Sequence, residues 1–61
     1  MPVVVVWMWE GRTPDQKERL VKGIAEAFEG IGTKAEHVDV IINDVSKSNW
    51  GKGGELASNL K

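Results

Sequence analysis

Pro2 stands directly after the start methionine, where it could supply a base that no internal residue can supply. Small residues at the second position generally permit removal of the initiator methionine, and the chain would then begin with a proline whose nitrogen is a free secondary amine. The apolar run Val3–Trp9 follows at once. We therefore expect the amine at the end of a stiff, buried strand, where desolvation would lower its pKa toward neutrality. An amine poised in this way suits proton transfer, although a proline is also tolerated simply as the first residue of a strand.

Arg12 is the second candidate, because a planar guanidinium can bind a carboxylate bidentately and favour negative charge developing on an adjacent oxygen. The strand between the two candidates separates Arg12 from Pro2 by roughly 23 Å, at about 3.3 Å for each of about seven residues. They therefore cannot share a site within one extended subunit. Two copies of this strand running antiparallel would bring Arg12 of one copy near Pro2 of the other, and the open edges of a two-stranded unit favour such pairing.

Three tryptophans could shape an apolar site. Trp50 lies among turn residues and glycines, where it could shield the proline from water, anchor the tail or contact another subunit. Trp7 and Trp9 alternate onto the same face of their strand, where core or interface packing is expected.

Length and composition narrow the class of protein. The chain has 61 residues, 41% hydrophobic and 28% charged, which is typical of a single globular domain spanning residues 1–61. It has no cysteine and one histidine, His37, so disulfides and a multi-histidine metal site within one chain are excluded. The net charge of −1 and the lack of a basic tract argue against nucleic-acid binding. The longest apolar run is too short to span a bilayer and lacks the charged leader of a signal peptide, so we expect a cytoplasmic protein without a membrane partner.

The elements that position these residues can be predicted from local patterns. The run over residues 3–9 lacks polar alternation, which predicts a strand buried on both faces. Thr13, Pro14 and Gln16 form a helix-start signal with a capping box, and Gly30 and Gly32 end a helix of about sixteen residues. Its expected apolar stripe consists of Leu20, Val21, Ile24, Ala27, Phe28 and Ile31.

Residues 38–45 form the second predicted strand, with Val38, Val40 and Ile42 on one face and Asp39, Ile41 and Asn43 on the other. Strand, helix and strand make a β-α-β unit, whose strands should be parallel and whose crossover should be right-handed. The turn-rich segment that follows predicts a small hairpin or hooked tail. A core this small barely offsets the entropy lost on folding, so oligomerisation is expected.

The whole chain resembles the 4-oxalocrotonate tautomerase family. The resemblance is carried by Met1-Pro2 before an apolar strand, by Glu10-Gly11-Arg12-Thr13, by Gln16-Lys17, by Val40-Ile41-Ile42 and by Trp50-Gly51-Lys52-Gly53-Gly54-Glu55-Leu56-Ala57-Ser58. The combination of the N-terminal proline, the glycine-arginine pair and the tail motif is far more specific than any one of them.

This resemblance implies an α/β fold in which β-α-β subunits form dimers with a four-stranded sheet, and usually a hexamer. It implies that Pro2 is a general base that moves a proton from an enol oxygen to carbon in 2-hydroxymuconate-like dienols, without a cofactor. Arg12 matches the family arginine that contacts the substrate from a neighbouring subunit. Trp50 stands where a phenylalanine commonly shields the proline, and Trp9 stands where a leucine is usual.

One position departs from the family pattern. The family enzyme has a second arginine one residue before the Val-Ile-Ile run, and here that residue is Asp39. An aspartate would repel a second substrate carboxylate. A different subunit could supply the missing arginine, as in hetero-hexameric members. Asp39 could instead act on another substrate as a proton-handling or water-activating group. Alternatively, Asp39 could point to solvent while Lys47 or Lys52 takes over the role of the missing arginine.

Two further functions therefore stand beside a tautomerase. A hydratase or hydrolytic dehalogenase would use the proline as an acid and Asp39 to activate water. A non-catalytic subunit would instead support a homologous catalytic partner chain.

Overall fold

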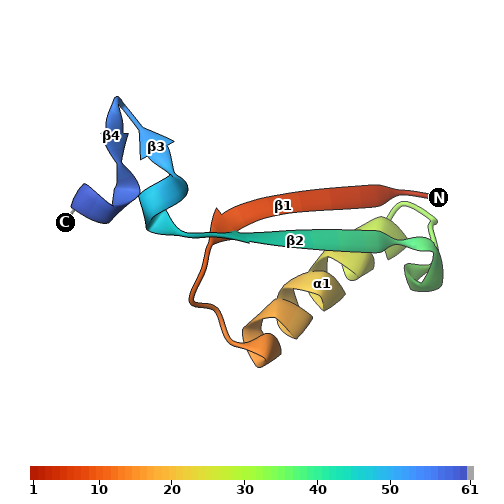
Figure 1. Cartoon of the computed structure of the whole chain (residues 1–61). Coiled ribbons are helices and arrows are strands. Elements are labelled where there is room, and N and C mark those ends of the chain that lie inside the picture. Colours follow the sequence, from red (N-terminus) through yellow and green to blue (C-terminus); the bar gives the residue numbers. More distant parts are fainter. Residues whose placement is uncertain (61) are drawn as a thin grey trace.

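The computed structural model describes residues 1–60, and Lys61, the last residue of the predicted domain, lies outside them. The chain forms a β-α-β unit followed by a short hairpin (Figure 1), which confirms the predicted fold class of the subunit. The principal elements are β1 (Val3–Trp9), α1 (Pro14–Glu29), β2 (Asp39–Val45), β3 (Gly51–Lys52) and β4 (Glu55–Leu56). Short 3-10 turns span Ala35–His37, Lys47–Asn49 and Ala57–Asn59. None of the helices within residues 1–60 is long and apolar enough to cross a membrane.

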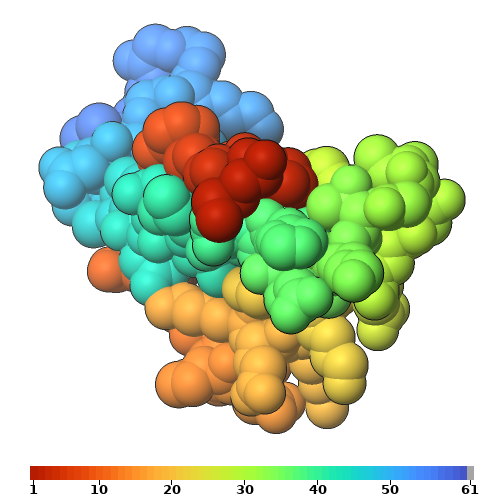
Figure 2. Space-filling view, turned by 90° about the vertical axis from the view of Figure 1, so that its right-hand side faces the viewer, coloured from red at the N-terminus to blue at the C-terminus, as the bar shows by residue number. Residues whose placement is uncertain are grey.

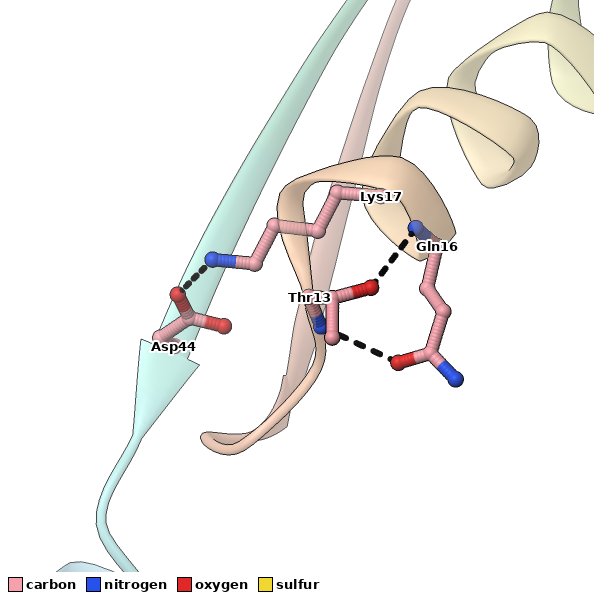
Figure 3. A network of polar contacts seen from close by, with 4 residues as sticks. All are labelled: Thr13, Gln16, Lys17 and Asp44. Atoms are coloured by element: carbon pink, nitrogen blue, oxygen red, sulfur yellow. Dashed lines mark hydrogen bonds and ion pairs between the residues drawn. The ribbon is translucent and has the colours of Figure 1, made fainter.

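The start of α1 is held by the predicted capping box. The Thr13 hydroxyl accepts a hydrogen bond from the Gln16 backbone N–H at 3.1 Å, and the Gln16 side-chain oxygen accepts one from the Thr13 N–H at 3.0 Å (Figure 3). One residue later, Lys17 forms an ion pair with Asp44 near the end of β2. The first turn of the helix is therefore attached to the second strand, and Arg12 directly precedes this attachment.

β1 and β2 are parallel, and their register places Val3 beside Asp39 and Trp9 beside Val45. At one end the Asp39 N–H donates to the Pro2 carbonyl at 3.0 Å, and at the other the Glu10 N–H donates to the Val45 carbonyl at 3.0 Å. The strands are thus paired over their full length.

Only one face of this sheet is covered, so the prediction of a strand buried on both faces is wrong for the single chain. α1 lies against one face (Figure 1), where Val4, Val6 and Met8 are half-buried. The alternate residues of β1 on the opposite face are exposed, Trp7 at 64%. One amphipathic helix can cover only one face of a two-stranded sheet, and the apolar residues of the other face remain for another molecule.

The predicted apolar stripe of α1 is only partly buried. Val21, Ile24 and Phe28 are half-buried, whereas Leu20 and Ala27 are exposed. Ile31 follows the end of the helix and is 77% exposed.

The tail contains the predicted hairpin. β3 and β4 pair in antiparallel fashion, with Gly51 opposite Leu56 and Lys52 opposite Glu55. Gly53 and Gly54 make the turn with φ values of 61° and 85°, a left-handed conformation that favours glycine. The hairpin projects beyond the carboxyl ends of β1 and β2, away from α1 (Figure 1).

The subunit is extended rather than compact. Its accessible surface is 4791 Å², whereas a compact monomer of this mass would expose about 3900 Å². Its radius of gyration is 14.5 Å, against about 10.5 Å for a compact domain of this length. Among residues 1–60, Ala57 is the one hydrophobic residue that is buried, at 2% exposure. Viewed from the N-terminal end, the first residues of the chain lie at the surface (Figure 2).

Candidate active site

Arg12 lies at the carboxyl end of β1 in a hollow of about 780 Å³. Residues from β1, the start of α1 and the tail line it, among them Trp9, Arg12, Gln16, Leu20, Lys47 and Trp50. Arg12 is exposed, and within residues 1–60 no ion pair ties it to a carboxylate. Its guanidinium is therefore free to bind an anion.

Two tryptophans and a lysine form one wall of this hollow. The rings of Trp9 and Trp50 meet edge to face, with centroids 5.9 Å apart and planes inclined by 78°. The Lys47 ammonium lies 4.8 Å from the centroid of the Trp9 ring, within the range of a cation–π contact. The Trp50 carbonyl accepts a hydrogen bond from the N–H of buried Ala57 at 2.7 Å. Trp50 therefore anchors the tail on β1, and the hollow combines apolar walls with cations.

Pro2 lies at the other end of β1. It is half-buried, whereas Met1 before it is 89% exposed. Together with Lys34 and His37 from the segment before β2, Pro2 lines a second hollow of about 430 Å³. Asp39 is adjacent through its backbone hydrogen bond to Pro2, and its side chain is exposed.

A single subunit therefore brings together only part of the predicted site. Trp9, Arg12 and Trp50 share one hollow, while Pro2 and Asp39 lie at the opposite end of the seven-residue strand β1. In Figure 1 the N-terminus marks the proline end, and the start of α1 and the hairpin lie toward the other.

Two lysines at the ends of β1, Lys47 and Lys34, are not assigned to the site by the sequence alone. Sequence reasoning left Lys47 and Lys52 as equivalent substitutes for the missing arginine, but Lys47 lines the Arg12 hollow and Lys52 is not among its lining residues. Lys34 lies near Pro2 because the segment leading into a parallel second strand returns to the start of the first. That signal was available from the predicted topology.

Known proteins with similar sequences and structures share the full length of this chain. The family model described as tautomerase enzyme matches residues 2–59. A 2-hydroxymuconate tautomerase from Pseudomonas sp. strain CF600 is 37% identical over 62 aligned positions, covering 100% of this chain and 98% of that protein.

Solved structures agree with the sequence match. A 4-oxalocrotonate tautomerase isozyme from Methylibium petroleiphilum is 40% identical, with a TM-score of 0.89 and 97% of each chain covered. A heterohexamer 4-oxalocrotonate tautomerase from Chloroflexus aurantiacus J-10-fl is 27% identical, with a TM-score of 0.90 and both chains fully covered. From the family match, the full-length identity and the shared β-α-β fold, we conclude that this chain belongs to the tautomerase family.

Proposed function

We propose that the protein is a cytoplasmic, cofactor-independent keto-enol tautomerase that acts on 2-hydroxydienoates of the 2-hydroxymuconate type. Removal of Met1 exposes the Pro2 amine, which serves as the general base. Support comes from the names of full-length relatives and from the position of Pro2 at the start of a paired strand.

The reaction needs only a proton carrier and a group that holds the substrate. The Pro2 nitrogen accepts the proton as the O–H bond of the enol breaks, and it returns that proton to carbon as a C–H bond forms. The double bonds shift and the enol oxygen becomes a ketone, so no oxidant or reductant is consumed. Arg12 binds the substrate carboxylate and fixes the dienol beside the amine.

The two functional ends meet only if subunits associate. β1 has β2 on one edge and no strand on its other edge within residues 1–60. In our proposal, β1 of a second copy pairs there antiparallel, which makes a four-stranded sheet and brings Arg12 of one copy toward Pro2 of the next. The subunit exposes about 900 Å² more accessible surface than a compact monomer of the same mass. This excess is close to the roughly 800 Å² that each partner buries in a standard interface.

Larger assembly would cover the remaining apolar face of the sheet. Val3, Val5, Trp7 and Ile41 are each more than 40% exposed there, and exposed apolar patches of this kind mark interfaces. A hexamer built from three dimers is our proposed form, and the heterohexameric relative is an example of a six-subunit assembly.

The test compares Met1-free and Met1-retaining protein, each verified by intact mass. Ketonisation of 2-hydroxymuconate, followed by ultraviolet absorbance, should fall by roughly 10²- to 10⁴-fold when Met1 blocks the amine, the usual contribution of a general base. Pro2→Ala is a milder control because it leaves a primary amine. Equal rates for the two preparations would exclude Pro2 as the base.

Asp39 favours one alternative activity, the hydration or hydrolytic dehalogenation of an unsaturated acid. A carboxylate beside a protonated proline could activate water while the proline donates a proton. Asp39→Asn should abolish such hydration, and full activity in that variant would dismiss the alternative. Native mass measurement tests the remaining alternative, a non-catalytic subunit that supports a different catalytic chain. An active complex that contains only this chain would exclude it.

A further inference from the structure

We propose that Lys47 is a second substrate-binding cation and that the substrate carries a single carboxylate with an apolar, conjugated remainder. This inference rests on the proposed tautomerase function and names its substrate class. It follows from the distribution of charge and aromatic surface between the two ends of β1.

Positive charge gathers at the Arg12 end. Lys47 and Arg12 line the same hollow, with Glu10 as the acidic residue among its lining residues. Contact with the Trp9 ring at 4.8 Å holds the Lys47 ammonium at the wall of this hollow. Because a cation–π contact does not use up all three N–H donors of the ammonium, Lys47 can still donate to a carboxylate. Arg12 and Lys47 can therefore bind one carboxylate together with the neighbouring enol oxygen.

Apart from Glu10 and Gln16, the other residues that line this hollow are apolar or glycine. The edge-to-face rings of Trp9 and Trp50 form one wall, and Leu20, 37% exposed, adds an aliphatic surface. A flat conjugated chain can pack against these rings without leaving a polar group unpaired. A second carboxylate placed among them would lose its hydration and gain only neutral donors, the indole N–H groups and the Gln16 amide.

Asp39 adds a negative charge at the Pro2 end, although it is not among the residues that line the Pro2 hollow. Asp39 is hydrogen-bonded through its backbone to Pro2, and its carboxylate would repel a carboxylate at the far end of a substrate held by Arg12 and Lys47 of another copy. Lys34 and His37 line the hollow on this end and are the remaining groups that could offset the repulsion. A substrate with a neutral far end avoids the conflict.

The experiment uses two dienols that differ only at the far end. One is 2-hydroxymuconate, and the other is 2-hydroxyhexa-2,4-dienoate, in which a methyl group replaces the distal carboxylate. With the Met1-free oligomer, kcat/KM should be about tenfold higher for the monocarboxylate, because the loss or gain of one charged contact has roughly this effect. Asp39→Asn should raise kcat/KM for 2-hydroxymuconate and so reduce the preference for the monocarboxylate. Lys34→Met should lower kcat/KM for 2-hydroxymuconate and so increase that preference.

Lys47 is tested by variants that separate its charge from its packing. Lys47→Met keeps an unbranched chain against Trp9 and should raise KM for the monocarboxylate about tenfold with kcat within about twofold. Lys47→Arg should restore KM. Lys52→Met removes the same charge from the hairpin, outside the hollow, and should leave both constants unchanged.

The outcomes separate this inference from the proposed function. A preference for 2-hydroxymuconate, or an unchanged KM in Lys47→Met, overturns the inference and leaves the tautomerase proposal intact. If the Met1-free protein ketonises neither dienol, the proposed function fails. Binding of the monocarboxylate is then measured by quenching of tryptophan fluorescence. An affinity about tenfold weaker in Lys47→Met supports the inference, and an equal affinity in that variant overturns it.

Discussion

The two ends of β1 differ in how much of their structure one chain can supply. At the Arg12 end, the capping box, the Lys17–Asp44 ion pair and the packing of Trp50 on Trp9 all come from the same subunit. At the Pro2 end, a backbone hydrogen bond to Asp39 holds the strand, while Met1 and the open sheet face are exposed. One end is therefore preformed within the subunit, and the other needs a neighbour to exclude water from it.

This contrast bears on the reaction proposed for so small a chain. Binding a carboxylate requires fixed cations, which local capping and short-range packing can position. Lowering the pKa of an amine requires desolvation, which half-burial of Pro2 within one subunit provides only in part. The proposed base therefore depends on assembly more than the proposed binding groups do.

The largest predicted effect comes from breaking assembly. Trp7→Glu places a charge on the open face of the sheet, where burial in an interface would cost several kcal/mol. We expect dissociation in analytical ultracentrifugation and loss of ketonisation, although Trp7 lines neither hollow. Ile31→Glu is the matched control, since Ile31 is even more exposed but lies beyond the end of α1. An intact, active Trp7→Glu oligomer would contradict the proposed interface.

The next effect tests whether the two ends belong to different subunits. Arg12→Ala should lower kcat/KM by about 10- to 100-fold through loss of a charge-assisted contact, whereas Arg19→Ala, which removes an exposed arginine paired with Asp15, should not. Refolding Arg12→Ala chains together with equal amounts of Met1-retaining chains should recover about one quarter of wild-type activity, by random pairing across subunits. No recovery from the mixture would mean that Pro2 and Arg12 act within one chain.

A smaller effect concerns the local order of the Arg12 end. Thr13→Ala removes the side-chain acceptor of the capping box and should lower the free energy of unfolding by about 1 kcal/mol. Urea denaturation at fixed protein concentration measures this loss. Thr13→Ser retains the hydroxyl and should retain most of the stability. We expect KM to rise more than kcat falls in Thr13→Ala, because Arg12 precedes the cap. A change confined to kcat would argue against this positioning role.

The smallest effect is that of the ion pair between α1 and β2. Lys17 and Asp44 are each about one-third exposed, so solvent screens their attraction. A double-mutant cycle with Lys17→Met and Asp44→Asn should give a coupling of about 0.5 kcal/mol. A coupling of zero would show that this ion pair does not help to hold the start of the helix.

Prediction from sequence succeeded where the signal was local or periodic. Thr13, Pro14 and Gln16 predicted the helix start because a capping box is encoded within four residues. Alternation along β2 predicted that Val40 and Ile42 would share one face, and both are half-buried whereas Ile41 is exposed. The prediction that β1 is buried on both faces is wrong for the single chain. An apolar run does not distinguish a face covered within one chain from a face covered by another subunit.

The topology places the segment before β2 near Pro2, but individual side-chain contacts between distant segments do not follow from the sequence. Nothing in the sequence pattern pairs Lys17 with Asp44, and the cation–π contact of Lys47 with Trp9 depends on how the tail folds back over the end of β1. For the same reason, the sequence alone does not distinguish Lys47 from Lys52 as a lining residue of the Arg12 hollow.

By itself, the sequence determined the order of the elements, the position of Pro2 behind Met1 and the substitution of Asp39 for an arginine. These are properties of residue identity and short-range spacing. Only the tertiary structure decided which face of the sheet stays open and which residues share a hollow, Lys47 with Arg12 among them. Such relations depend on the parallel register and the return of the tail, which bring side chains together regardless of their separation along the chain.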